Sequence, residues 1–286
     1  MSEPAEFLAL ALVKAAPLIF AALAGVLCER AGILNIALEG QLAAGAFVAV
    51  AAAAATGNAL AGLAAGVLAG AVLGGVLGFA ATRFGVDQIV AGTGLNLLAI
   101  GGAAFGLVVI FGQPGASPSV ASLGAPGAHL LIATALACAF ALHLVLYHTP
   151  WGLRVRACGE NPRAVASAGL DPKSIRLLAT TVGGALAGLG GVYLSLGELN
   201  LYSDGMSAGR GFIALAAVIF GRWTPLGATG AALAFGALSA LQFILQRSGV
   251  PSELMQALPY LAALAALAGI AGRARAPRAD GVPYVE

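Results

Sequence analysis

The chain has 286 residues, of which 9% are charged and 60% are hydrophobic, and its net charge is only +2. Soluble domains contain about 25% charged residues, so this composition excludes a soluble globular protein and indicates a polytopic membrane protein. The first residues, MSEPAEF, lack the basic segment of a signal peptide. We therefore expect the first apolar run to be retained as a membrane span.

Apolar runs in chain order predict the membrane elements, since a spanning helix needs about 20 apolar residues. Eight runs are long enough, at residues 7–27, 33–55, 60–80, 89–111, 129–147, 175–196, 226–245 and 254–270. A ninth run, at 212–220, is too short and precedes the helix-breaking stretch GRWTPLG, which is typical of a broken or re-entrant helix. The run 33–55 carries Asn35 and Glu39 and is also a candidate for a break. The fold class predicted is an all-α, polytopic transmembrane helical bundle of about 8–10 membrane elements, one or two of them short or broken.

Basic residues predict the orientation, because cytoplasmic loops carry an excess of Lys and Arg. If the loop 149–176 and the C-terminal tail are cytoplasmic, eleven basic side chains face inward and only Arg210 and Arg247 face outward. This arrangement places the N-terminus outside. We expect a membrane domain over residues 1–272 and a cytoplasmic tail over 273–286.

The run 60–80 carries glycine at every fourth position, which creates a smooth groove along one helix face. Such grooves let a second backbone approach closely in lipid, so tight helix packing is predicted, with a pore-lining role as the alternative. The glycines are Gly62, Gly66, Gly70, Gly74 and Gly78, and Gly184 and Gly188 repeat the spacing later.

A few strongly polar side chains interrupt the apolar runs. Asn35 and Glu39 are four residues apart and would share a helix face, as would Thr93 and Asn96, three apart. A carboxylate at membrane depth costs at least about 2.5 kcal/mol unless it is paired or hydrated. We predict that these four residues line or support a solute pathway. Hydrogen bonding between helices, or a position near the interface for Glu39, is the alternative reading.

The basic loop 149–176 predicts a short, well-delimited helix between two spans. Asn161 is a good N-cap, Pro162 a good first helical residue and Gly169 a good stop. The helix 162–168 has only about two turns and little stability of its own, so we expect it to dock on a partner. The alternative is an ordinary basic cytoplasmic loop.

Catalytic motifs are missing from the sequence, which contains no HEXXH, GxSxG or nucleotide-binding P-loop pattern. The three cysteines and three histidines show no metal-ligand spacing. We therefore predict no catalytic residue, no metal site and no enzyme activity, which disfavours a membrane-embedded enzyme.

Several ordered segments resemble one family of transport proteins. ERAGILNIALEGQ, GENPRAVASAGL and GRGFIALAAVIFGRWTPLGA, followed by PSELMQALPYLAALAAL and GVPY, resemble permease subunits of bacterial ABC importers in the branched-chain amino acid and monosaccharide permease superfamily. The resemblance covers nearly the whole chain. It is greatest to the nucleoside permeases that work with basic-membrane-lipoprotein-type binding proteins.

This resemblance implies a multi-pass permease of the bacterial cytoplasmic (inner) membrane that translocates a small polar solute. Its expected partners are an ABC ATPase subunit, which uses the ATP, a second and different permease, and an extracytoplasmic solute-binding lipoprotein; no cofactor is expected on this chain. The implied ATPase-coupling residues are Glu160, Asn161, Pro162, Arg163, Ala164, Ala166, Ser167, Ala168 and Gly169.

The solute favoured by the resemblance is a nucleoside, because the stretch ILNIALEG differs from its counterpart in sugar permeases. A simple sugar such as ribose or galactose, or a branched-chain amino acid, is the alternative within the family. A secondary transporter or channel is the alternative from another class. Against it, the spans offer no acid and base set beyond Glu39 and Lys14.

Overall fold

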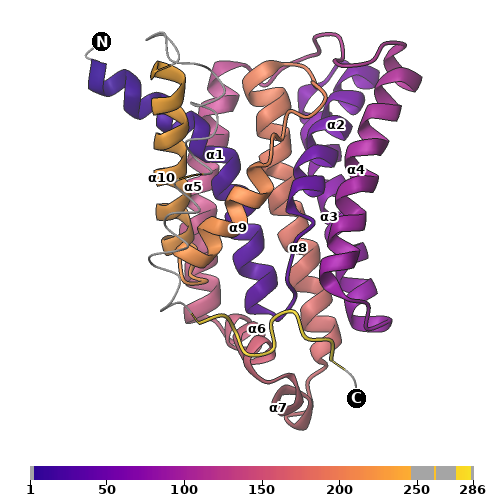
Figure 1. Ribbon diagram of the computed structural model, residues 1–286, viewed down its shortest axis with the longest axis vertical. Coiled ribbons are helices and arrows are strands. Elements are labelled where there is room, and N and C mark those ends of the chain that lie inside the picture. Colours follow the sequence, from indigo (N-terminus) through magenta and orange to yellow (C-terminus); the bar gives the residue numbers. More distant parts are fainter. Residues whose placement is uncertain (1–2, 246–260, 262–274, 285–286) are drawn as a thin grey trace.

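The computed structural model describes residues 3–245, 261 and 275–284, and within them the chain folds as an all-α bundle (Figure 1). The helices are α1 (Glu3–Arg30), α2 (Leu38–Thr56), α3 (Ala59–Arg83), α4 (Gln88–Phe111), α5 (Gly124–His148), α6 (Pro150–Glu160), α7 (Pro162–Ser167), α8 (Pro172–Val192), the π-helix η1 (Tyr193–Leu199), α9 (Arg210–Phe220) and α10 (Pro225–Leu245). The predicted fold class is confirmed.

Seven of the described helical segments are long and apolar enough to cross a membrane, and α9 is a shorter apolar helix. These seven correspond to the first seven long runs of the sequence, with η1 extending α8, and α9 corresponds to the short run 212–220. The eighth long run, at 254–270, lies outside the described residues apart from Leu261.

Helix starts follow local capping rules at several turns. The side chain of Asp87 accepts hydrogen bonds from the amides of Ile89 and Val90 at the start of α4. Asn58 caps α3 in the same way through the amide of Leu60. These side chains satisfy amides that the first helical turn leaves without an intrahelical partner.

The glycine row of α3 packs directly on α8. A Cβ atom added to Gly70 would lie 2.3 Å from the carbonyl oxygen of Gly184, and one added to Gly184 would lie 2.2 Å from that of Gly70. Gly74 and Gly188 make similarly close backbone approaches. The prediction of tight helix packing is confirmed, and these buried glycines do not face a pore.

Two crossings of the bundle are broken. Residues 31–37 leave the end of α1 without helical structure, and α2 begins only at Leu38. Residues 200–209 likewise precede the eleven-residue helix α9. Both helices begin inside the bundle rather than at one of its ends (Figure 1).

The two ends of the bundle carry different parts of the chain. The N-terminus lies at one end, and α6, α7 and the C-terminal residues lie at the other (Figure 1). If α7 is cytoplasmic, as the basic residues predict, the N-terminus is outside. The side of the membrane itself stays a prediction from charge.

Candidate solute pathway and coupling surface

Glu39 connects the two broken crossings. Its Oε1 atom accepts a hydrogen bond from the amide of Gly209 at 2.8 Å, and its Oε2 atom accepts one from the amide of Gly211 at 2.7 Å. The side chain belongs to the first turn of α2 and is only 4% exposed. A Cβ atom on Gly211 would lie 2.4 Å from the backbone nitrogen of Glu39, so only glycine allows this approach. We call the meeting point of the first turns of α2 and α9 the junction.

The junction places a carboxylate between two helix N-termini. Helix N-termini carry partial positive charge on unpaired amides, and a carboxylate there is stabilising. The buried charge of Glu39 is therefore compensated by the backbone of α9 and by the first turn of its own helix. Among the described residues, no Lys or Arg side chain pairs with Glu39.

Asn96 of α4 holds the break before α2. Its Oδ1 atom accepts a hydrogen bond from the amide of Gly40 at 2.7 Å, and its Nδ2 atom donates to the carbonyl oxygen of Ile36 at 2.9 Å. Ala37 occupies the N-cap of α2 and has no side-chain acceptor, so Asn96 supplies the cap from another helix. Gln88 adds a further contact by accepting from the amide of Leu34 at 2.7 Å.

The predicted helix face shared by Asn35 and Glu39 is wrong, because Asn35 lies in the non-helical segment 31–37. Asn35 is completely buried, and its Nδ2 atom donates to Oε1 of Gln41 at 3.1 Å. Its amide thus satisfies groups next to the break. The break itself was expected from the two polar residues in this run.

Thr93 and Asn96 do not point the same way either. Thr93 is exposed and donates its hydroxyl to the carbonyl oxygen of Ile89, one turn earlier in α4. The buried face of α4 is narrow at this level and includes Gly92, Leu95 and Asn96. A step of three residues along a helix moves around the axis by about 60°, which is enough to leave Thr93 outside that face.

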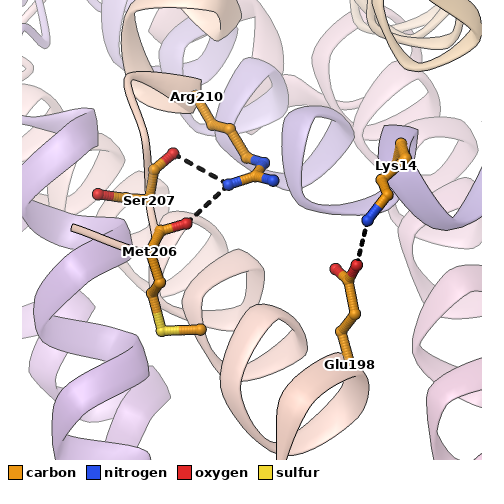
Figure 2. Close-up of polar contacts among 5 residues, drawn as sticks. All are labelled: Lys14, Glu198, Met206, Ser207 and Arg210. Atoms are coloured by element: carbon orange, nitrogen blue, oxygen red, sulfur yellow. Dashed lines mark hydrogen bonds and ion pairs between the residues drawn. The ribbon is translucent and has the colours of Figure 1, made fainter. Parts of the chain in front are cut away.

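The charged side chains near α9 have partners of their own (Figure 2). Lys14 of α1 forms an ion pair with Glu198 of η1, so it does not form an acid and base set with Glu39. Arg210, which the charge pattern predicts to face outward, is the first residue of α9 and lies next to the junction. Its Nη1 atom donates to the carbonyl oxygens of Met206 and Ser207 at 2.7 and 3.3 Å, which folds the end of segment 200–209 back onto the helix.

The loop 149–176 contains two helices, one more than predicted. Helix α7 has the expected ends: Oδ1 of Asn161 accepts from the amide of Ala164 at 3.2 Å, and Gly169 has a φ of +78°. Helix α6 was missed, although Thr149 caps it through the amide of Gly152 at 3.1 Å and Pro150 is its first residue.

The coupling residues predicted on α7 divide between its exposed and inner sides. Val165, which is not among the predicted coupling residues, is buried and anchors the helix. Ala166 is half-buried. Most of the others are exposed, namely Glu160, Asn161, Arg163, Ala164, Ser167, Ala168 and Gly169, while Pro162 is half-buried. The surface available to a partner is therefore made mainly of short side chains, beside the carboxylate of Glu160 and the guanidinium group of Arg163.

Arg176 is an important polar residue that sequence reasoning placed in a basic loop. It is only 1% exposed, and it donates to the carbonyl oxygens of Ala31 at 3.1 Å, Ala279 at 3.2 Å and Val282 at 3.0 Å. One side chain thus joins the start of α8, the non-helical segment 31–37 and the C-terminal residues. Its partners are backbone carbonyls, which leave no signature in a sequence.

The end of α1 is tied to the end of α9 by a second polar contact. Glu29 is only 3% exposed and accepts a hydrogen bond from Nε1 of Trp223. Arg30 donates from Nε to the carbonyl oxygen of Trp223 at 2.7 Å. These contacts and those of Arg176 hold both broken crossings at the end of the bundle that carries α6 and α7 (Figure 1).

Comparison with known proteins identifies the family. The family described as the branched-chain amino acid transport system permease component matches residues 7–267. The chain belongs to this family. The guanosine ABC transporter permease NupQ of Bacillus subtilis is 37% identical over 96% of this chain and 95% of its own length. The nucleoside ABC transporter permease NupC of Lactococcus lactis is 32% identical over the same shares of the two chains.

A third relative of this ABC permease carries a different name. The putative glucose ABC transporter permease TsgC13 of Haloferax volcanii is 31% identical over 85% of this chain and 78% of its own length. No solved structure matches the chain. The permease is a multi-pass protein of the cytoplasmic membrane and a transport component rather than an enzyme, and its system includes an ATPase subunit and a binding protein.

Proposed function

We propose that this permease translocates nucleosides. The observation that carries the proposal is the likeness to the guanosine and nucleoside permeases, which match nearly the whole of both chains at higher identity than the glucose permease does. A binding lipoprotein would deliver the solute from outside. A second, different permease would complete the membrane pore, and an ABC ATPase subunit would supply the energy.

The junction supports the proposed pathway. Discontinuous helices whose N-termini meet inside the membrane are a common setting for solute sites in transporters. Asn35, Glu39 and Asn96 would support the pathway by holding both breaks in place, because their hydrogen bonds go to groups beside those breaks. Thr93 would line the pathway only if the exposed face of α4 packs on the second permease.

Helix α7 is the proposed coupling element. Its ends are fixed by Asn161 and Gly169, it lies at the end of the bundle away from the N-terminus, and it presents short side chains to its surroundings (Figure 1). A two-turn helix of this kind is stabilised by docking on a larger surface. The cleft of an ATPase subunit would provide that surface.

Transport assays on the whole complex test the proposed function. Proteoliposomes with the permease pair, the ATPase and the binding lipoprotein should accumulate radiolabelled guanosine when hydrolysable ATP is present on the ATPase side. A non-hydrolysable ATP analogue should abolish uptake, and excess glucose or leucine should leave it unchanged. Uptake that follows a proton gradient without ATP hydrolysis would instead favour a secondary transporter, and competition by glucose would favour a sugar permease.

The coupling role of α7 has its own matched pair of variants. Ser167 is exposed on α7, and Ser119 is exposed at the opposite end of the bundle. Ser167→Trp should overfill the ATPase cleft and abolish the ATP hydrolysis that solute-loaded binding protein stimulates. Ser119→Trp should leave the coupling contact intact, so a complex captured through this variant should keep its ATPase subunit. Wild-type ATPase capture and wild-type stimulated ATP hydrolysis in Ser167→Trp would contradict the role of α7.

A further inference from the structure

A groove runs along the cytoplasmic end of the permease between α7 and the C-terminal residues. One wall consists of residues 160–163, and the other consists of residues 278, 279 and 282–284. The groove has a volume of about 400 Å³. We call the described C-terminal residues 275–284 the tail. The tail therefore forms one side of a hollow whose other side is the first turn of the proposed coupling helix.

The tail wall is held in place by the body of the protein. The amide of Ala279 donates to the carbonyl oxygen of Gly159 at 2.8 Å, directly before α7. Arg176 donates to the carbonyl oxygens of Ala279 and Val282. These contacts fix the tail relative to α7, so a partner would meet a groove that is already formed and would lose little binding energy in ordering it.

The walls of the groove offer a specific surface chemistry. Arg163 on the α7 wall and Arg278 on the tail wall are both exposed, and the exposed carboxylate of Glu160 lines the α7 wall as well. The two guanidinium groups outnumber this one carboxylate, so the charge of the groove is net positive. Val282 is 54% exposed, although its side chain is entirely apolar. Such a surface fits a segment with a carboxylate opposite the guanidinium groups and an apolar side chain on the valine, because guanidinium and carboxylate groups form strong, oriented hydrogen bonds.

We propose that the tail is the second half of the docking surface for the ATPase subunit. The inference rests on the proposed function of α7, and it adds a contact that α7 alone does not make. The groove is continuous with α7, so a subunit that clasps this helix would also reach the tail. The occupant of the groove would be a segment of the ATPase with an acidic and an apolar side chain.

Docking on the tail would also act on the broken crossing before α2. Arg176 holds the tail with two hydrogen bonds and holds Ala31, the first residue of segment 31–37, with a third. Force on the tail would therefore be transmitted through one buried side chain to the segment that leads to the junction. This is a contiguous set of contacts between the ATPase surface and the proposed pathway.

Charge reversal within the tail tests the proposal. Arg278→Glu should place a carboxylate opposite the acidic segment of the ATPase, and like charges in an interface cost enough to lower capture of the ATPase about tenfold. Arg275→Glu is the matched control, since Arg275 is also exposed and on the tail but does not line the groove. Both variants would be compared as complete complexes captured through the permease, after gel filtration confirms that each permease is folded.

The outcomes separate this proposal from the proposed function. If Ser167→Trp lowers capture of the ATPase and Arg278→Glu behaves like Arg275→Glu, the tail contact is wrong and the role of α7 stands. If neither Ser167→Trp nor Arg278→Glu differs from the wild type, both fail. A photoreactive amino acid at position 282 gives a second reading: it should cross-link to the ATPase, and its failure to do so in an intact complex would overturn the tail contact.

Discussion

The carboxylate of Glu39 and the backbone of Gly211 join two broken crossings that are 172 residues apart in the chain. The amide of Gly209 completes the same contact. Irregular backbone at membrane depth is tolerated only where its polar groups are satisfied by protein or water. The junction meets this requirement with one side chain.

Replacing Glu39 should therefore destabilise the permease in steps. Glu39→Ala leaves the amides of buried Gly211 and half-buried Gly209 without this acceptor, and a fully buried unsatisfied group costs about 1–3 kcal/mol. Glu39→Gln keeps one acceptor oxygen and should have an intermediate effect. In thermal unfolding of the detergent-purified permease, the midpoint temperature should decrease from the wild type to the Gln variant and further to the Ala variant. A Gln variant less stable than the Ala variant would show that the acceptor is not what matters at this site.

Asn96 offers a test of the break before α2. Asn96→Leu removes both the acceptor for Gly40 and the donor for Ile36, so we expect solute uptake to fall while the complex still assembles. Thr134→Val in α5 is the control, since the Thr134 hydroxyl donates to the carbonyl oxygen of Leu130, one turn earlier in its own helix. The assay is guanosine uptake in proteoliposomes beside capture of the ATPase. Normal uptake by the Leu variant would show that Asn96 only joins helices and is not needed for transport.

The close approach of α3 and α8 gives a steric prediction. Gly70→Ala would place a methyl group 2.3 Å from the Gly184 carbonyl, and overpacking of this kind costs about 1–3 kcal/mol or more. Gly102 of α4 has open space around its Cβ position, so Gly102→Ala should be neutral or stabilising by up to about 1 kcal/mol. The midpoint of thermal unfolding measures both. If the Gly70→Ala and Gly102→Ala variants unfold at the same midpoint temperature, α3 and α8 can move apart without loss of stability.

Features governed by neighbouring residues were predictable from the sequence. Apolar runs located the membrane helices because length and hydropathy decide insertion. The ends of α7 were predictable because Asn161 and Gly169 act on their own turn. Helix α6 also begins with a capping residue, Thr149, and a proline, Pro150. It was missed because its basic residues were read as part of a cytoplasmic loop.

Features governed by distant residues were not predictable. Asn35 and Glu39 look like two positions on one helix, and only the contacts with Gln41, Gly209 and Gly211 show that the helix starts between them. Arg176 looks like a cytoplasmic charge, yet three backbone carbonyls hold it inside the protein. Backbone partners carry no side-chain signal, so a single sequence cannot reveal them.

The orientation of the bundle is tested by cysteine labelling. Ser167→Cys on α7 and Ser119→Cys at the other end are exposed positions, and Cys28 and Cys158 are buried. In a Cys138→Ala background, a membrane-impermeant maleimide should label position 119 in intact cells and position 167 only in inverted vesicles. The reverse pattern would place α7 outside and exclude its contact with an ATPase.

The last prediction concerns Asp280 in the tail. It describes how pH affects the packing of the tail against the rest of the permease, which we call tail docking. Burial raises the pKa of this carboxyl group from its ordinary value of 3.8 to about 7, against the opposing effects of a hydrogen bond from the backbone of Gly281 and of the charge on Arg176. Glu29 of α1 and the thiol of Cys28 are the other titratable groups that face it. Its Oδ1 atom is buried and accepts no hydrogen bond from any described residue.

A carboxyl group whose pKa is higher in the docked tail than in a released tail takes up a proton on docking. Docking is therefore most favourable below the ordinary pKa, weakens as the pH rises toward 7, and changes little above it. Limited proteolysis of the detergent-purified permease between about pH 5 and pH 8 should release the tail more readily at the higher pH. Asp280→Asn should keep the tail protected across the range, because the amide carries no charge to bury. A wild-type tail that is equally protected at both ends of the range, or an Asn variant that keeps the dependence, would show that another group controls docking.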